Sequence, residues 1–258
     1  MKMIYNKSSQ LIVILFFLIL TFSLFSETDL PKTMTTIAGR PGKRGYSGNG
    51  DNAKKAILNR PHRVFVFKNY VYVADTISHA IRRFPVKGGK IETLAGGIGP
   101  GFNGNSIPAR RAKLHTPASV FVDDEYVYIA EIGNQSIRRF QIGGNIETIA
   151  GGNGTGYSGD GKKAIKARFN YPHGVWVHEG FVYITDDFNH AVRRFKVGGN
   201  IETIAGGNGK GYSGDNGPAV QSKMNEPISC VPGNDGYFYV VEYGNHAVRR
   251  FKVGGNIE

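Results

Sequence analysis

The feature that most constrains this chain is a fourfold internal repeat of 55 to 57 residues, with copies at 36–92, 93–147, 148–202 and 203–258. Each copy holds four short runs rich in β-branched and aromatic residues, separated by Gly, Asn, Asp and Pro, which is the pattern of strands joined by tight turns. One small antiparallel sheet cannot bury both of its faces, so successive sheets are expected to pack face to face around an axis. The sequence predicts an all-β propeller of four blades, each a four-stranded antiparallel sheet.

The third copy shows the expected layout of a blade. Its strands are predicted at 175–177, 181–185, 191–197 and 201–205, and an Ala/Lys-rich stretch before them is long enough for two helical turns at most. The single cysteine, Cys230, falls on a strand position and is expected to be a core residue.

The phase of the repeat suggests how the ring closes. Residues 35–39 read as an orphan fourth strand, and the last two residues stand where the fourth strand of the last copy begins. Residues 35–39 would then complete blade four and remove an open sheet edge. The alternatives are an open arc of a larger, six-blade ring and a truncated gene model.

The N-terminus is a separate segment. Lys2 and Lys7 precede an apolar run at 11–25, which is short for a membrane helix and fits the apolar core of a secretory signal. We expect a signal peptide at 1–26, a mature propeller at 35–258, and a secreted or lumenal location. The alternative is a single-pass anchor with the propeller outside, and that anchor would be the only link to a membrane.

The motifs within the copies resemble a known family. The string VYVADTISHAIRRF contains Asp75 and His79, DDFNHAVRR begins at Asp186, and the linker reads TIAGGNGTGYSGDG. Together they resemble NHL repeats, in particular the long-linker repeats of teneurin-like and of protist or bacterial extracellular propellers. The resemblance covers 35–258 and implies a propeller that binds proteins, sugars or nucleic acid on one face, with a few lyases among its members.

Two polar sets are candidates for function or structure. The turn after the second strand carries acidic residues and histidines that we interpret as structural, since short acceptors bind turn amides; a cation-binding carboxylate ring is the alternative. These turn residues are Asp75, His79, Asp186, His190 and His246. The acidic position is Glu131 in copy two and Glu242 in copy four, so the pattern is not uniform.

His62 and His173 follow the first-strand prolines of copies one and three, which oppose each other in a four-blade ring. A catalytic zinc needs three protein ligands, and only these two are visible. A metal-dependent lyase or lactonase with its site at the channel mouth is kept as the alternative function. The main hypothesis expects no cofactor. The GxGxxG string at 154–159 recurs in other linkers and lacks the βαβ unit of a dinucleotide site.

The linkers supply the candidate ligand surface. One aromatic residue recurs at the same phase of each copy, and basic residues follow it; the set is Tyr46, Phe102, Tyr157, Tyr212, Lys54, Lys55, Arg110 and Arg111. With a net charge of +12, a basic face would attract polyanions. The export signal makes nucleic acid a poor partner. The main hypothesis is a non-catalytic binding scaffold for a protein, an acidic glycan or a cell surface; a purely architectural ectodomain is a further alternative.

Overall fold

The short apolar runs of the repeat form antiparallel strands in the computed structural model, which describes residues 34–258. Blade 1 and blade 2 each contain a four-stranded meander, and a short extra strand lies on the outer edge of blade 2. Their strands are β1 (Pro61–Phe67), β2 (Tyr70–Asp75), β3 (Ala80–Pro85), β4 (Glu92–Gly96), β5 (Ile107–Pro108), β6 (Pro117–Val122), β7 (Val127–Glu131), β8 (Ser136–Phe140) and β9 (Asn145–Gly151).

Blades 3 and 4 continue the same order. Their strands are β10 (Pro172–His178), β11 (Phe181–Asp186), β12 (Ala191–Phe195), β13 (Ile201–Gly206), β14 (Pro227–Pro232), β15 (Phe238–Glu242) and β16 (Ala247–Phe251). In blade 4 the fourth position is occupied by Glu258, which exchanges two backbone hydrogen bonds with Arg250. The prediction of four antiparallel blades is confirmed.

Each linker carries one three-residue 3₁₀ turn, and a second turn follows the second strand of most blades. The turns are η1 (Ala53–Lys55), η2 (Thr76–Ser78), η3 (Ala109–Arg111), η4 (Ala164–Lys166), η5 (Asp187–Asn189), η6 (Ala219–Gln221) and η7 (Tyr243–Asn245). The helical stretch expected in the third linker is therefore the single turn η4. Within the described residues, no helix is long and apolar enough to cross a membrane; the predicted signal peptide lies outside these residues.

The middle blades bury both faces of their sheets. On β11, Val182 and Ile184 pack with blade 2, whereas Tyr183 packs with blade 4. This explains why the runs are almost continuously apolar, since both sides of a central blade face a neighbour. Cys230 is buried in the core between blades 3 and 4, as predicted, and burial raises the pKa of its thiol.

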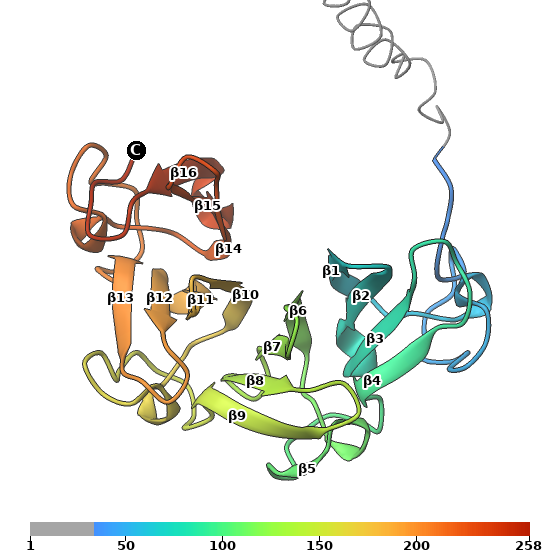
Figure 1. The fold of residues 1–258 in the computed structure, drawn as a ribbon. Helices are drawn as coiled ribbons and strands as arrows, with labels where there is room; N and C mark the ends of the chain where they lie inside the picture. The colour runs from blue at the N-terminus through green and yellow to red at the C-terminus, as the bar shows by residue number, and fades with distance from the viewer. Residues whose placement is uncertain (1–33) are drawn as a thin grey trace, which may run out of the picture. The chain divides into compact units, whose positions relative to one another are not determined.

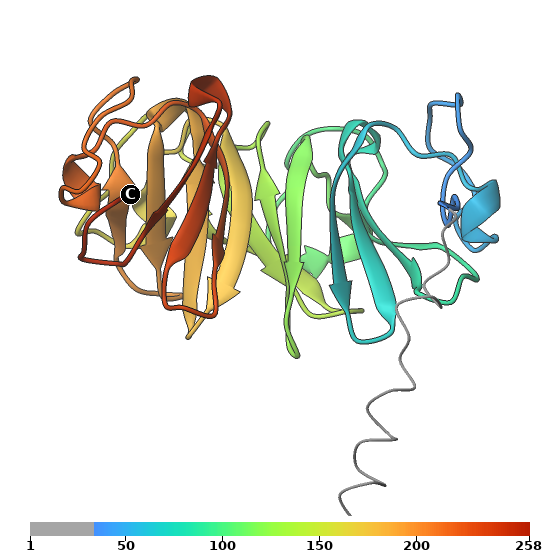
Figure 2. The same cartoon turned by 90° about the horizontal axis from the view of Figure 1, so that it is seen from above.

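Within the compact unit Ile37–Glu258 the blades follow one another along an arc (Figure 1). Successive blades pack through their inner strands, β1 against β6, β6 against β10, and β10 against β14. The view from above shows the strands of the blades crossing the thickness of the arc (Figure 2).

The expected closing strand is not formed. Residues 35–39 are not a strand, and Gly39 donates its N–H to the carbonyl of Ala53 in η1, beside blade 1. Ala38 and Leu58 pack on the core of blade 1. The segment is therefore held against a hydrophobic cluster of blade 1 and its linker, and the prediction that it completes blade 4 is wrong.

Candidate ligand groove and channel mouth

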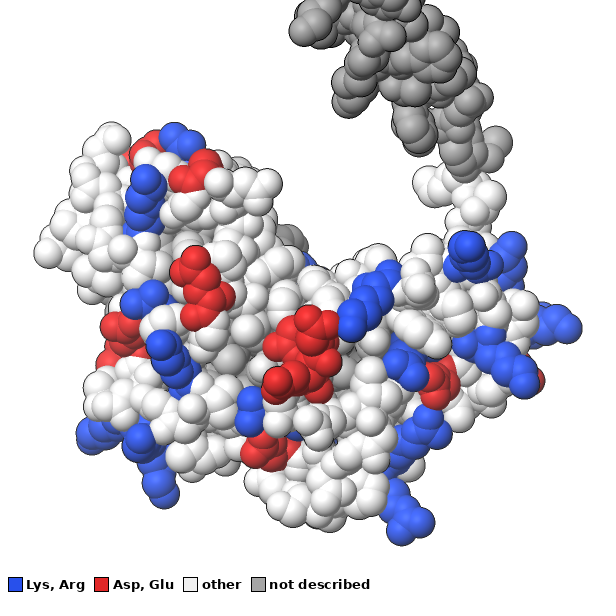
Figure 3. Space-filling model, viewed as in Figure 1, with Lys and Arg blue, Asp and Glu red and all other residues white. Residues whose placement is uncertain are grey.

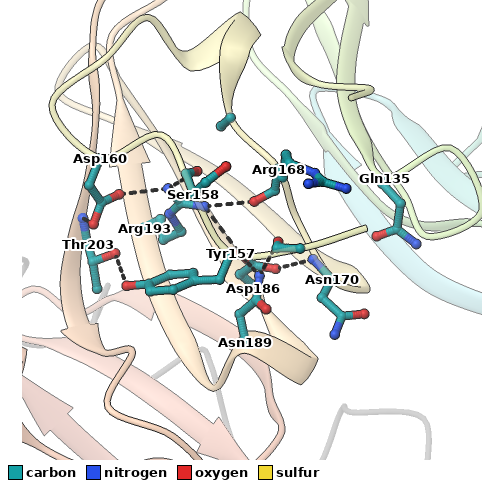
Figure 4. Close-up of polar contacts among 12 residues, drawn as sticks. Gln135, Tyr157, Ser158, Asp160, Arg168, Asn170, Asp186, Asn189, Arg193 and Thr203 are labelled. Atoms are coloured by element: carbon teal, nitrogen blue, oxygen red, sulfur yellow. Dashed lines mark hydrogen bonds and ion pairs between the residues drawn. The ribbon is translucent and has the colours of Figure 1, made fainter. Parts of the chain in front are cut away.

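A buried acid–arginine pair anchors each blade to its linker. In blade 3, Asp186 lies 3.3 Å from Nη1 of Arg193 and accepts a hydrogen bond from the backbone N–H of Asn170 (Figure 4). Arg193 also donates to the carbonyl of Ser158 in the linker. The corresponding pairs Asp75–Arg82, Glu131–Arg138 and Glu242–Arg249 are likewise buried. Each of these acids is therefore paired with an arginine of its own blade.

The turn histidines join one blade to the next. His79 and His190 both have a left-handed backbone, with φ of 53°. Each accepts through Nδ1 a backbone hydrogen bond from the following blade, His79 from Thr116 and His190 from Glu226. His246 occupies the same turn of blade 4 with the same φ.

The four linker aromatics do not gather into one collar, because each belongs to its own blade. Their rings stack on the buried arginines, with ring centroids about 5 Å from the guanidinium carbon, and their other faces are exposed. The stacked pairs are Tyr46–Arg82, Phe102–Arg138, Tyr157–Arg193 and Tyr212–Arg249.

Blade 2 differs from its neighbours at the linker aromatic residue. The Tyr157 hydroxyl lies 2.8 Å from Oγ1 of Thr203 on the outer strand, and Tyr46 and Thr93 make the same contact at 2.7 Å. We call this hydroxyl–hydroxyl contact the latch. Phe102 has no hydroxyl, and the Thr148 hydroxyl donates to Oδ1 of Asn105 instead. Blade 2 therefore has no latch.

A groove of about 550 Å³ lies at this point, between blades 2 and 3. It is lined by Phe102, Asn105, Gly133, Asn134, Gln135, Ser136, Thr148, Gly151, Gly152, Asn153, Gly154, Thr155, Ile165 and Lys166. Gly151 has a φ of +73°, and a side chain there would overlap the Gln135 carbonyl and the Phe169 ring, so only glycine fits. The groove combines one aromatic face, several amides and hydroxyls, and one lysine.

The groove walls are held by their own hydrogen bonds. The side-chain nitrogen of Asn153 donates to the carbonyls of Ile165 and Ala167, which fixes η4 as one wall. Oε1 of Gln135 accepts the backbone N–H of Tyr171 in blade 3. A groove whose walls are fixed before binding loses less entropy when a ligand enters.

The basic candidates lie on the outer rim. Lys54 and Lys55 belong to η1, Arg110 and Arg111 to η3, and the groove residue Lys166 to η4. Figure 3 shows Lys and Arg spread along the outer edge of the blades, and acidic residues gathered nearer the middle of that face. Arg110 is paired with Glu92 at 2.7 Å, and the other four residues are exposed.

The structure brings His62 and His173 together, as the repeat phase predicted. Their ring centroids lie 4.7 Å apart, edge to face. Burial lowers the pKa of His173 to about 4, and its Nδ1 lies 3.0 Å from the Ile228 carbonyl oxygen. Beside them Arg63 donates to Oγ of Ser229. Among residues 34–258 no group of three His, Cys, Asp or Glu side chains could hold a metal, so these residues do not fit a three-ligand zinc site.

Sequence reasoning missed Asp187, which is buried at the start of η5 with its Oδ1 making no hydrogen bond. Burial raises its pKa to about 7, and the carboxylates of Glu226 and Asp186 add to the rise. The signal was present as a second acid after Asp186, at a position that holds Thr76 in blade 1.

The sequence and the fold were compared with those of known proteins. No family model matches the sequence. The chain is 26% identical over 225 residues to SUPPRESSOR OF QUENCHING 1 of Arabidopsis thaliana, a chloroplast protein, covering 81% of this chain and 21% of that protein. It is 26% identical over 260 residues to teneurin-1 of Mus musculus, covering 88% of this chain and 9% of that protein. These similarities support a propeller of the NHL type.

The chain spans about a fifth or less of the length of these curated relatives. Among solved structures it is similar to a catalytically inactive virginiamycin B lyase from Staphylococcus aureus with quinupristin, with a TM-score of 0.50, 16% identity and coverage of 77% and 54% of the two chains. It is also similar to an auxiliary nutrient binding protein from Bacteroides thetaiotaomicron, with a TM-score of 0.51, 19% identity and coverage of 70% and 44%. At these identities the likeness shows the fold alone.

Proposed function

We propose that this chain is an exported, non-catalytic binding propeller whose groove between blades 2 and 3 takes an acidic oligosaccharide. The observation that carries the proposal is the open groove beside Phe102, where the neighbouring blades have a latched tyrosine. Blade 4 keeps a tyrosine, Tyr212, but its hydroxyl donates to Asp215 rather than to a threonine. Phenylalanine therefore occurs at this position in blade 2 alone, and a residue found in one blade points to function more than a feature found in every blade, because repeated features serve the repeat.

The chemistry of the groove suits a sugar that carries negative charge. The exposed face of Phe102 offers an apolar platform, since aromatic rings present large flat surfaces. Lys166 at one end can pair with a carboxylate or sulfate, and the basic rim would raise the local concentration of a polyanion. The similarity to teneurin-1 supports a propeller of the NHL type.

Changing Phe102 to tyrosine tests this function. The new hydroxyl is expected to reach Oγ1 of Thr148 and form the latch seen in blades 1 and 3. Closing the groove should weaken the binding of a defined sulfated uronic-acid oligosaccharide at least about tenfold, which corresponds to about 1.4 kcal/mol. Isothermal titration calorimetry at low salt measures the affinity. Tyr157→Phe, which removes the latch of blade 3 and lies outside the groove lining, is the matched control and should leave the affinity of the groove between blades 2 and 3 unchanged.

Two further outcomes decide the ligand class. Lys166→Gln should weaken binding, whereas Lys162→Gln, outside the groove lining, should change it little. Unaltered binding by the Phe102→Tyr variant would exclude the groove as the site. Retention of a partner protein by the chain, with no retention of the oligosaccharide even at low salt, would replace the glycan by a protein ligand.

A second candidate function, a metal-dependent lyase or lactonase, is favoured by one observation, the contact between His62 and His173 at the channel mouth. The binding proposal expects no stoichiometric metal in the purified full chain, as measured by plasma mass spectrometry. A stoichiometric metal that is lost in the His62→Ala/His173→Ala double variant, but kept when the rim residue Lys54 is changed to alanine, would contradict a binding function alone.

A further inference from the structure

One position on the inner strands carries a different kind of residue in blade 1. The first strand of every blade shifts its register directly after its proline, as at a β-bulge, and such bulges re-aim side chains and are common beside binding sites. The residues that follow the shift are Arg63, Ser119, Gly174 and Ser229. Three of them are small, so they leave space for one long side chain, that of Arg63.

Arg63 reaches from blade 1 to blade 4 across the inside of the arc. Its Nη1 donates a hydrogen bond of 3.2 Å to Oγ of Ser229 in β14. The strands β1, β6, β10 and β14 are the ones nearest the centre of the arc (Figure 1). Gly174 lets β10 and β14 approach closely at this level, because a side chain there would overlap Oγ1 of Thr185 and crowd the Ile228 carbonyl oxygen. The Arg63 guanidinium therefore lies among inner strands of the same chain.

Arg63 has no carboxylate beside it within residues 34–258. The arginines of the repeated Arg–Arg motif each form an ion pair with an Asp or Glu; they are Arg82, Arg83, Arg138, Arg139, Arg193, Arg194, Arg249 and Arg250. Burial lowers the pKa of Arg63, and no carboxylate of the described residues opposes this effect. A partly buried charge without a counter-ion is costly, so this position favours an anion.

The His173 imidazole supplies a second polar group at the same level. Its Nδ1 lies 3.0 Å from the Ile228 carbonyl oxygen, which can only accept a hydrogen bond, so Nδ1 carries the proton. Burial lowers the pKa of His173 to about 4, and the nearby positive charge of Arg63 acts in the same direction. The ring is therefore neutral near pH 7, and its Nε2 is a hydrogen-bond acceptor.

We propose that the centre of the arc binds a small hydroxycarboxylate, whose carboxylate pairs with Arg63 and whose hydroxyl donates to Nε2 of His173. The planar fork of a guanidinium matches a carboxylate, and one positive charge balances one negative charge. A doubly charged phosphate would leave one charge unbalanced. None of these residues lines the groove between blades 2 and 3, so this is a second site.

Calorimetric titration of the full chain with sodium glycolate, in a neutral detergent and at fixed ionic strength, tests the proposal. The wild type should bind one glycolate per chain. Ser229→Asp places a carboxylate where Oγ now accepts from Arg63, so the new ion pair should weaken glycolate binding at least about tenfold. Ser229→Asn has the same size without the charge and should bind glycolate at least about tenfold more tightly than Ser229→Asp. Circular dichroism should show an unchanged fold for both variants.

A second pair of variants tests the arginine itself. Arg63→Gln should weaken glycolate binding at least about tenfold, whereas Arg44→Gln, the same change at an exposed linker arginine, should not. Acetate, which lacks the hydroxyl, and inorganic phosphate should each bind more weakly than glycolate. No binding of glycolate by the wild type, or equal binding by the Ser229→Asp and Ser229→Asn variants, would overturn the proposal. So would acetate or phosphate that binds as tightly as glycolate.

Discussion

Replacing Arg193 by alanine is expected to lower the free energy of unfolding by about 3 to 5 kcal/mol, because the change leaves a buried carboxylate without its partner. The side chain is fully buried and pairs with Asp186. It also donates to the carbonyls of Ser158 and Arg168, which belong to the linker. One substitution therefore removes the contacts that hold the linker on blade 3.

Urea unfolding followed by fluorescence measures this loss. The next residue, Arg194, provides the matched control, because its pair with Glu202 at 2.6 Å lies at the surface. Arg194→Ala should cost at most about 1 kcal/mol, as surface ion pairs contribute little. Equal losses for the two variants would show that the buried network does not hold the blade.

Replacing Asp187 by asparagine is expected to stabilise the protein by about 1 to 2 kcal/mol near neutral pH and above, where the buried carboxylate is charged and incompletely hydrogen-bonded. The pKa of Asp187 is about 7 in the folded chain, against an ordinary value of 3.8. Between these two values the unfolded chain loses its proton first. The folded state then binds more protons, so this group makes stability fall as pH rises through that range.

Unfolding midpoints of the wild type and the Asp187→Asn variant, measured at the acid and the neutral end of this range, test the sign. The two proteins should be alike at the acid end and differ most at the neutral end. Asp124→Asn, at an exposed carboxylate, should show no such trend. A wild type that gains stability relative to the Asp187→Asn variant as pH rises would contradict the raised pKa.

The blades could be predicted from the sequence because the repeat gives the same strand signals four times. The strand predicted at 191–197 is β12 (Ala191–Phe195), and that at 175–177 lies within the second half of β10 (Pro172–His178). The closing strand could not be predicted, because the motif of residues 35–39 also fits beside η1 of blade 1. Whether residues 35–39 pair with blade 4 or pack beside blade 1 depends on the distance between the two ends of the arc. The sequence pattern of the segment does not give that distance.

The candidate site was predictable only in part. The approach of His62 and His173 followed from the phase of the repeat. The role of Phe102 could not be predicted in this way. The groove is open because Phe102 lacks the hydroxyl that Tyr46 and Tyr157 carry. It also depends on the side chain of Thr148, which lies 46 residues further along the chain. Asp187 could not be predicted from the repeat, because the other copies have Thr76, Ile132 and Tyr243 at the same position.

The repeated junction also bears on how such a gene can change. Thr148 and Thr203 lie at equivalent positions within the outer strands β9 and β13, and each strand leads into a linker of nearly the same sequence. Unequal recombination between these two points would remove or add one unit of 55 residues while every strand kept its order and register. Blade number in this lineage can therefore vary in whole steps, and a new copy arrives with its contacts to both neighbours already encoded.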